Sequence, residues 1–325
     1  MDKEVEEIIR LGNGVELFVD GTRILLDPRR AEGLSFVSHA HSDHAPSKVS
    51  GEVISTEETG ELLSRHFSTL AYEQKFENLG VSFRLIPSGH MLGSSQVVIE
   101  NGFKVIYTGD LHLEGGATSG MGVVEGCDIL IIESTFGSPF YILPDREYVL
   151  GEIKDWIEDC FSRGDVPVLL GYSLGKAQEI IKLLSGDYKL GLHRAVYENC
   201  RKYEALGVNL GSYELYSENI REEKEDRVLI FPPAARNSLK GNFKKALLSG
   251  WALHGATKFK FRVDEAFAIS DHSDFNGLVN YVEKASPQVI YTLHGFAEEF
   301  SDELKARGFY ASPLTKKQTG LNHFL

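Results

Sequence analysis

The nine residues FVSHAHSDH, at positions 36–44, place three histidines and one aspartate directly after a short apolar run. His39 and His41 alternate, so in an extended chain their side chains leave the same face. Asp43 and His44 follow on a turn and can fold back over the same point. Imidazole together with carboxylate is the donor set of Zn²⁺, Mn²⁺ and Fe²⁺ rather than of Ca²⁺. Four donors are too many for one tetrahedral ion that keeps a water, so the stretch predicts two metal ions that share a site.

The composition is that of a soluble globular protein of one or two domains, with 325 residues, 42% apolar and 25% charged. The acidic start MDKEVEE has no apolar run behind it, which argues against a signal peptide, and no apolar stretch is long enough for a membrane span. The three cysteines are scattered, as is typical of thiols in a reducing compartment. We therefore expect a cytoplasmic protein. The net charge of −13 argues against indiscriminate nucleic-acid binding but leaves room for a local basic groove.

Other acids and histidines stand at the ends of apolar runs. The segment 15–27 predicts a hairpin around its Asp-Gly pair, and the segment 81–99 predicts two strands joined by the loop SGHMLGS. The residues that end these and later runs are, in chain order, Asp27, His90, Asp110, Glu133, His272 and His294. We therefore expect a site along the carboxyl-terminal edge of a sheet that is buried on both faces.

The middle of the chain has a different character. Residues 145–163 carry an apolar stripe at helical spacing, 166–172 form an apolar strand pattern, and a second helical pattern covers 174–184. Helices that alternate with strands predict an inserted α/β domain. We expect the segments 1–137 and 253–325 to form one domain and the segment 138–252 to form the insert.

Two groups of cations are candidates for binding substrate phosphate. Ser173 and Lys176 lie in the turn GYSLGK at a helix start, where backbone N–H groups can hold an anion, although a capped helix with a solvated lysine has the same pattern. Lys258, Lys260 and Arg262 alternate on an expected strand, which puts three cations on one face. This face is either an exposed sheet surface or a strip that meets a phosphate backbone.

The histidine stretch resembles the His-x-His-x-Asp-His signature of the metallo-β-lactamase superfamily. ESTFG at 133–137, the inserted domain, SDH at 270–272 and LHG at 293–295 resemble motifs A, B and C of its β-CASP branch, which consists of nucleases that act on RNA or DNA. The resemblance covers nearly the whole chain. It implies an α/β fold, an αββα metallo-β-lactamase sandwich with a small inserted α/β β-CASP domain. The insert, about 115 residues long, is short for this branch.

Within the branch, the turn YSLGKAQ at 172–178 and the block 250–278 are most similar to the DNA-ligase-associated exonucleases. The RNA-processing members, including ribonuclease J and the pre-mRNA 3′-end endonuclease, are the other comparison. Both groups carry a histidine where this chain has His294, so that residue does not distinguish DNA from RNA.

The resemblance also implies roles for single residues. One metal ion would take His39, His41, His90 and Asp110, and the other would take Asp43, His44, Asp110 and His294. The expected cofactor is two Zn²⁺ ions, or Mn²⁺. Asp27 would support the histidines from behind. His272, oriented by Glu133, would be the general acid for the leaving oxygen, and Asp110 would bridge the two ions.

These roles predict a dinuclear metal nuclease that hydrolyses phosphodiester bonds in DNA repair or processing. We expect single-stranded nucleic acid as substrate, because a narrow cleft between two domains admits one strand more readily than a duplex. A DNA ligase or another repair factor is a candidate partner. The alternative is a ribonuclease of RNA 3′-end processing or decay. A remote alternative is a small-molecule metallo-hydrolase, which would leave Glu133, His272 and the inserted domain without a role.

Overall fold

The computed structural model describes residues 9–78, 80–217, 226–239 and 243–315. The chain divides into two compact units. The first unit comprises Met1–Gly115, Ser119–Tyr141 and His272–Leu325, and the second comprises Gly116–Thr118 and Ile142–Asp271. The insert therefore ends later than the expected boundary at 252. The reason is that strand β19 (Glu265–Phe267) pairs with β18 (Phe243–Leu248) and belongs to the sheet of the second unit.

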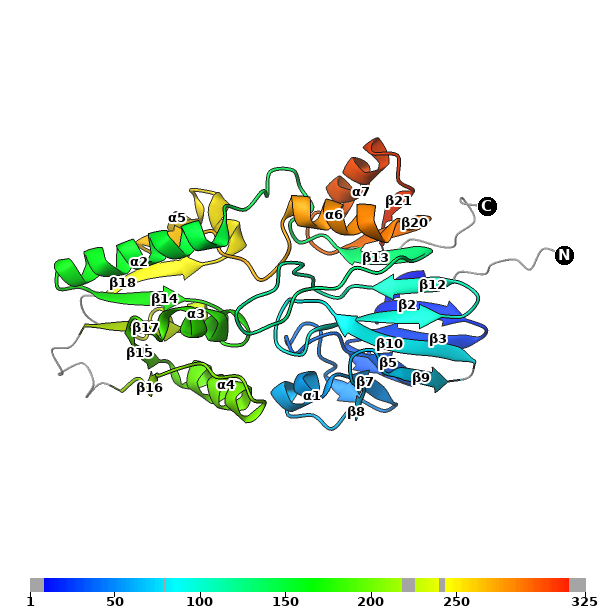
Figure 1. Ribbon diagram of the computed structural model, residues 1–325, viewed down its shortest axis with the longest axis horizontal. Coiled ribbons are helices and arrows are strands. Elements are labelled where there is room, and N and C mark those ends of the chain that lie inside the picture. Colours follow the sequence, from blue (N-terminus) through cyan, green and yellow to red (C-terminus); the bar gives the residue numbers. More distant parts are fainter. Residues whose placement is uncertain (1–8, 79, 218–225, 240–242, 316–325) are drawn as a thin grey trace. The chain divides into compact units, whose positions relative to one another are not determined.

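Within its described residues, the first unit contains two large sheets (Figure 1). The first sheet has the order β1 (Ile9–Gly12), β2 (Gly14–Val19), β3 (Thr22–Leu26), β5 (Leu34–Phe36), β7 (Val53–Ser55) and β8 (Ser68–Thr69). The second has the order β21 (Ala311–Pro313), β20 (Val289–Leu293), β13 (Ile129–Glu133), β12 (Lys104–Tyr107), β11 (Ser95–Glu100), β10 (Val81–Pro87) and β9 (Lys75–Asn78). A small pair, β4 (Arg30–Ala31) with β6 (Lys48–Val49), completes its strands. Its helices are α1 (Glu57–Leu63), α6 (Phe275–Ala285) and α7 (Ala297–Ala306).

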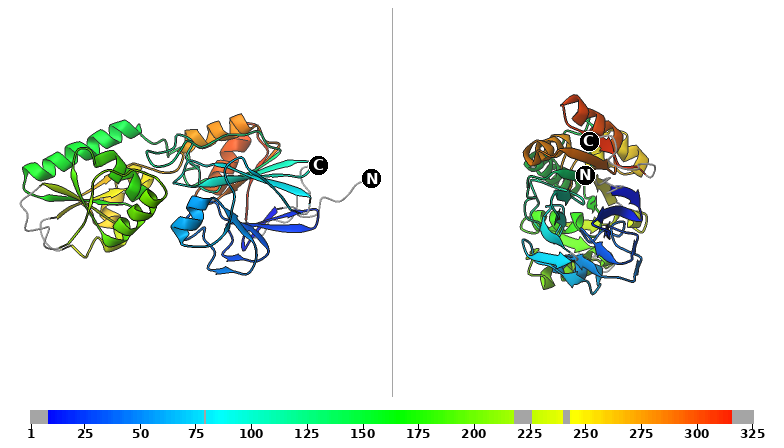
Figure 2. Two further views of the ribbon diagram at one scale, coloured as in Figure 1. Left: turned by 60° about the horizontal axis from the view of Figure 1, so that its bottom comes forward. Right: turned by 90° about the vertical axis from the view of Figure 1, so that its right-hand side faces the viewer.

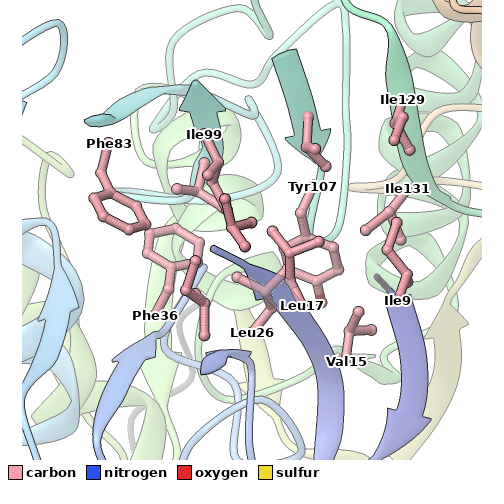
Figure 3. Close-up of a cluster of buried hydrophobic side chains, with 14 of the residues drawn as sticks. Ile9, Val15, Leu17, Leu26, Phe36, Phe83, Ile99, Tyr107, Ile129 and Ile131 are labelled. Carbon is pink, nitrogen blue, oxygen red and sulfur yellow. The ribbon is translucent and has the colours of Figure 1, made fainter. Parts of the chain in front are cut away.

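Alternation along the strands explains why these layers form. Leu17, Leu26 and Phe36 of the first sheet share one buried cluster with Ile99 and Tyr107 of the second (Figure 3). The intervening residues of the second sheet, such as Val98, Ile106 and Leu130, face the other way and cluster with Leu278 and Val282 of α6 and with Phe300 and Leu304 of α7. The second sheet is thus buried on both faces, as the apolar runs predicted. The αββα sandwich and the α/β fold class are confirmed.

The second unit is a parallel α/β unit. Its sheet has the order β16 (Glu214–Leu215), β15 (Lys189–Leu192), β17 (Arg227–Phe231), β14 (Val166–Leu170), β18 and β19, and its strand pairs are parallel. Helices lie on both sides of this sheet (Figure 2). They are α2 (Arg146–Ser162), α3 (Lys176–Leu184), α4 (Arg194–Ala205) and α5 (Thr257–Phe261), with 3-10 turns at Pro233–Ala235 and Gly250–Leu253. The predicted helix, strand and helix over 145–184 are therefore confirmed. No described helix is both long enough and apolar enough to cross a bilayer.

The prediction that Lys258, Lys260 and Arg262 alternate on a strand is wrong. The two lysines lie in helix α5, and Arg262 ends that helix in the left-handed conformation, with φ 54° and ψ 55°. Residues two apart on a helix point in different directions, so the three cations do not share a face. Phe261 of this helix packs against the core of the second unit.

Strand direction in the first unit decides where the site lies. Strands β12, β13 and β20 are mutually parallel neighbours. Strand β10 runs the same way, because β10 and β12 are each antiparallel to β11. The carboxyl ends of these four strands therefore meet at one edge of the sheet, where the loops that follow them can place side chains close together.

Candidate metal centre

Four side chains from three loops of the first unit converge on one point. They are His39 and His41, which follow β5, His90, which follows β10, and Asp110, which follows β12. The strand β5 ends at Phe36, so the two histidines of the HAH motif lie on the loop after it and not on a continuing strand. Their convergence therefore comes from the loop conformation rather than from strand alternation.

The spacing of the four donor atoms fits a tetrahedral ion. His41 Nδ1 lies 3.1 Å from His39 Nε2 and 3.2 Å from His90 Nε2. Asp110 Oδ2 lies 3.4 Å from His39 Nε2 and 3.6 Å from His90 Nε2. Bonds of about 2.0–2.1 Å from Zn²⁺ to nitrogen or oxygen give tetrahedral edges of about 3.3–3.4 Å. The donor set and its spacing make this cluster a candidate site for a divalent metal ion.

Asp110 faces two groups of histidines with its two oxygens. While Oδ2 faces His39 and His90, Oδ1 lies 3.5 Å from His44 Nε2. The ring of His294 lies beside that of His44, with 5.6 Å between the ring centroids. Asp43 is exposed on the turn before His44. Of the second expected ligand set, the structure thus groups Asp110, His44 and His294, and Asp110 has the orientation of a bridging carboxylate.

The electrostatics at His39 and Asp110 favour the protonation states that a metal ion requires. Burial and the neighbouring His44 hold the pKa of His39 well below its ordinary value, so its imidazole is neutral. Burial opposes the charge of Asp110, but His44 and the other histidines outweigh it and hold its pKa well below the usual range. A neutral imidazole and an ionised carboxylate are the ligand forms that bind metal.

Asp27 is buried and contacts Ser38, His44 and Tyr107. Its Oδ2 accepts hydrogen bonds from Ser38 Oγ at 2.6 Å and Tyr107 OH at 2.8 Å, and it lies 2.7 Å from His44 Nδ1. Its Oδ1 accepts from Ser38 N at 2.7 Å. Burial disfavours the charged form of His44, but Asp110 and Asp27 outweigh it and raise its pKa to about 10. The contact through Nδ1 leaves Nε2 of His44 directed at Asp110.

The backbone is constrained at the same place. Asp27 and His294 both have positive φ, 45° and 64°, which is uncommon for residues other than glycine. Gly109 also has positive φ, and a Cβ there would lie 2.5 Å from Cβ of Ser38. Glycine at 109 therefore allows the loop that carries Asp110 to approach the loop that carries His39. The sequence offered few signs of the roles of Ser38 and Tyr107, whose positions only the fold brings to Asp27.

A histidine and glutamate pair lies at the side of the cluster. His272 Nδ1 lies 2.9 Å from Glu133 Oε1, and His272 Nε2 lies 3.9 Å from Asp110 Oδ2. Glu133 is buried and also accepts from Leu111 N at 2.8 Å and from Thr135 N at 3.0 Å. Burial raises the pKa of its carboxyl, but His272 outweighs this effect and lowers it. The ionised Glu133 thus fixes the ring of His272 with Nε2 toward the cluster.

The five expected phosphate ligands, Ser173, Lys176, Lys258, Lys260 and Arg262, all lie in the second unit. Lys176 is buried, and its Nζ lies 2.8 Å from Asp271 Oδ1. The expectation of a phosphate at Lys176 is therefore not supported, because its ammonium group is turned inward to a carboxylate. Lys258 Nζ lies 3.7 Å from Glu265 Oε1. Ser173 accepts hydrogen bonds at its carbonyl from Gln178 and Asn199.

An αββα sandwich with a histidine and aspartate cluster at its sheet edge, interrupted by a parallel α/β unit, defines the metallo-β-lactamase class of fold. A crystal structure of a protein of unknown function from Enterococcus faecalis V583 matches this chain with a TM-score of 0.68 over 98% of both chains. The two sequences are 14% identical, so this likeness shows the fold alone. No family model matches the sequence.

Similarity to curated proteins indicates the branch of the metallo-β-lactamase class to which the chain is related. A probable DNA ligase of Opitutus terrae is 33% identical over 303 residues, which cover 88% of this chain and 29% of that protein. An RNase J-like protein of Methanocaldococcus jannaschii is 24% identical over 278 residues, which cover 69% of this chain and 66% of that protein. A probable RNase MJ4 of the same organism is 26% identical over 252 residues, which cover 62% of this chain and 58% of that protein. The chain spans less than two thirds of the length of each of these relatives. Together with the motifs and the fold, they confirm that the chain is related to the β-CASP nucleases of the metallo-β-lactamase superfamily.

Proposed function

We propose that the protein is a metal-dependent nuclease that hydrolyses phosphodiester bonds of single-stranded nucleic acid in DNA repair or processing. The observation that carries this proposal is the position of His272. Its Nδ1 is held by Glu133 at 2.9 Å, while its Nε2 lies 3.9 Å from Asp110 in the candidate metal cluster. A hydrolase of small activated substrates needs the cluster alone, whereas an alkoxide that leaves from phosphorus needs a proton, and a histidine in this position can deliver one.

The donor set divides into two groups that share Asp110. His39, His41 and His90 would hold one ion with Asp110, and Asp43, His44 and His294 would hold the other. Two Zn²⁺ ions suit the mixture of imidazole and carboxylate, and Mn²⁺ is the second choice. Divalent cations supply Lewis acidity, which activates water as a nucleophile and neutralises the charge that develops on the phosphoryl oxygens.

The chain's own residues complete the reaction. As the bond from phosphorus to the leaving oxygen breaks, the imidazolium of His272 gives the proton on Nε2 to that oxygen. Glu133 stabilises the imidazolium and keeps its ring oriented, in the manner of the aspartate in a catalytic triad. Glu133 is buried and its carboxylate is held by hydrogen bonds from Leu111 N and Thr135 N. Its position is therefore fixed, and this fixed carboxylate sets the orientation of the His272 ring.

The names of the relatives support two alternative substrates, DNA and RNA. The match to a probable DNA ligase supports action on DNA beside a ligase or another repair factor. The matches to an RNase J-like protein and to a probable RNase support the alternative, a ribonuclease of RNA 3′-end processing or decay, either exonuclease or endonuclease. We place DNA first because the match to the ligase has the higher identity and covers more of this chain.

The test compares matched, end-labelled single strands of DNA and RNA of one sequence, incubated with the metal-loaded protein. We expect cleavage of DNA to be faster, with His272→Ala losing most turnover while it keeps its metal. Faster cleavage of RNA would establish the alternative. Cleavage of neither strand with Zn²⁺ or Mn²⁺ would refute the nuclease proposal, and faster cleavage of blunt duplex than of single strands would refute the preference for single strands.

A further inference from the structure

Lys176 of the second unit is a buried cation without a part in the mechanism above. It is the first residue of helix α3, and only 4% of its surface is exposed. Its Nζ lies 2.8 Å from Asp271 Oδ1 and donates to the carbonyl of Ile269 at 3.2 Å. All three residues belong to the second unit, and Asp271 is its last residue, directly before His272. The ammonium group of Lys176 therefore holds the segment that leads into His272.

A second cation holds the residue between these two contacts. Arg146, at the start of α2, donates from Nη1 to the carbonyl of Ser270 at 3.5 Å and is paired with Glu179 on α3. Glu179 also accepts from the backbone N–H of Ala117 at 2.7 Å and of Thr118 at 3.0 Å. Thus Lys176 and Arg146 bind consecutive residues of the chain, from Ile269 to Asp271.

The chain is also held on the other side of His272. Ser273 N donates to the carbonyl of Leu111 at 2.6 Å, and Leu113 N donates to Ser273 Oγ at 3.0 Å. His272 therefore lies between two chain segments that hydrogen bonds hold, residues 269–271 before it and Ser273 after it. The ring of His272 contacts Glu133 only when the backbone after Asp271 has the conformation that points this side chain toward Glu133.

Stability alone does not explain a lysine at position 176. A buried ion pair contributes little net stability, because two charges must be taken out of water, and replacement by apolar residues is often neutral or stabilising. A lysine at the first position of a helix also opposes the helix dipole. The location of the pair, one residue before His272, indicates a role in orientation.

We propose that Lys176 is a positioning residue that acts through Asp271 to set the orientation of His272. This inference rests on the proposed role of His272 as the acid of a nuclease. It replaces the phosphate contact that the sequence suggested for Lys176.

The experiment uses Lys176→Met, which keeps the length of the side chain and removes the charge, and the double variant Lys176→Met/Asp271→Leu, which replaces the pair by apolar residues. Lys182→Met is the matched control, since Lys182 lies exposed on the same helix. Lys176→Arg tests rescue by a conserved charge. The readouts are the imidazole ¹⁵N and ¹H signals of His272, assigned with His272→Ala, the values of kcat and KM on the labelled strand, and the urea midpoint.

We expect Lys176→Met to lower kcat about 10–100-fold with little change in KM, because small misplacements of a catalytic group have effects of this size. The Nδ1–H signal of His272 should be lost or shifted. The double variant should regain the urea midpoint but not kcat, Lys176→Arg should regain part of kcat, and Lys182→Met should behave as wild type.

Two outcomes would overturn the proposal: an unchanged His272 signal in Lys176→Met, or recovery of kcat together with stability in the double variant. If the wild type cuts neither DNA nor RNA and Lys176→Met still alters the His272 signal, the nuclease proposal fails while the positioning role stands.

Discussion

Replacement of Asp27 by asparagine tests whether the histidine loop is held in place from behind. The carboxylate is buried and has four contacts, three at Oδ2 and one at Oδ1, all between 2.6 and 2.8 Å. An asparagine can put its carbonyl oxygen where Oδ2 lies and keep those three contacts. Its amide nitrogen then faces Ser38 N–H, so that a donor meets a donor.

The expected loss of stability follows from these four contacts. One buried N–H without an acceptor costs about 1–3 kcal/mol. Each of three hydrogen bonds to a charged acceptor weakens by up to about 1 kcal/mol when the acceptor becomes neutral. Part of this loss is offset because a buried charge no longer has to be desolvated. We therefore expect Asp27→Asn to lower the local free energy of unfolding by about 2–4 kcal/mol, and to weaken metal binding about 10–100-fold through His44.

Asp20→Asn is a matched control. Asp20 has a φ of 46°, close to the 45° of Asp27, so the backbone demand of the two substitutions is the same. It is exposed on the turn between β2 and β3, where it accepts one hydrogen bond from Asn101. The control should change neither stability nor metal binding by a measurable amount.

The assay is amide hydrogen exchange of peptides that contain β3 and β5, together with metal competition against a chelator. The two tryptophans, Trp156 and Trp251, both belong to the second unit, so urea unfolding followed by their fluorescence reports that unit and should be unchanged. The reasoning is refuted if Asp27→Asn exchanges as slowly as wild type and retains its metal equally well.

Three further substitutions test other parts of the structure. Glu133→Gln should retain metal but lower kcat by about 10²-fold or more, because the imidazolium of His272 loses its charged partner; metal loss equal to the loss of kcat would contradict this separation. Gly109→Ala should destabilise the first unit by about 1–3 kcal/mol, because its Cβ would overlap Ser38 and φ is positive, and an unchanged thermal midpoint would contradict it. For Glu16, burial opposes ionisation, but hydrogen bonds from two arginines and a backbone N–H outweigh it and lower its pKa to about 2. Because this pKa is depressed in the folded state, Glu16→Gln should cost about 1–3 kcal/mol at pH 7, and its difference from wild type should shrink as pH falls from 4.5 toward 2; a difference that is independent of pH in urea titrations would refute this account.

The cluster could be predicted because each candidate follows a strand. His90 comes after an alternating run, Asp110 and His294 come after continuous apolar runs, and parallel strands bring their carboxyl ends to one edge. Glu133 is the last residue of its strand and follows the same rule. Local pattern was sufficient here because each donor directly follows the strand that places it.

Local pattern failed where the same residues suit two structures. The alternation of lysine and phenylalanine at 257–262 fits an exposed strand, but the segment forms the helix α5, in which the partly buried Phe261 packs against the core of the second unit. The sequence suggests a phosphate contact for Lys176 because its partner, Asp271, is far away in the sequence. The expected end of the insert, at 252, is too early because β19 is assigned to its sheet only by pairing with β18.

By itself, the sequence determined the fold class, the order of the strand ends and the residue types that reach the metal cluster, since these depend on hydrophobic period and on residues close in the chain. Only the tertiary structure decided which oxygen of Asp110 faces which histidine, that Asp27 holds His44, and that Lys176 is turned toward Asp271. These contacts join residues at least 17 positions apart, and their energies depend on burial and on the exact approach of two chain segments. Neither burial nor the approach of two distant segments can be read from a short stretch of the sequence.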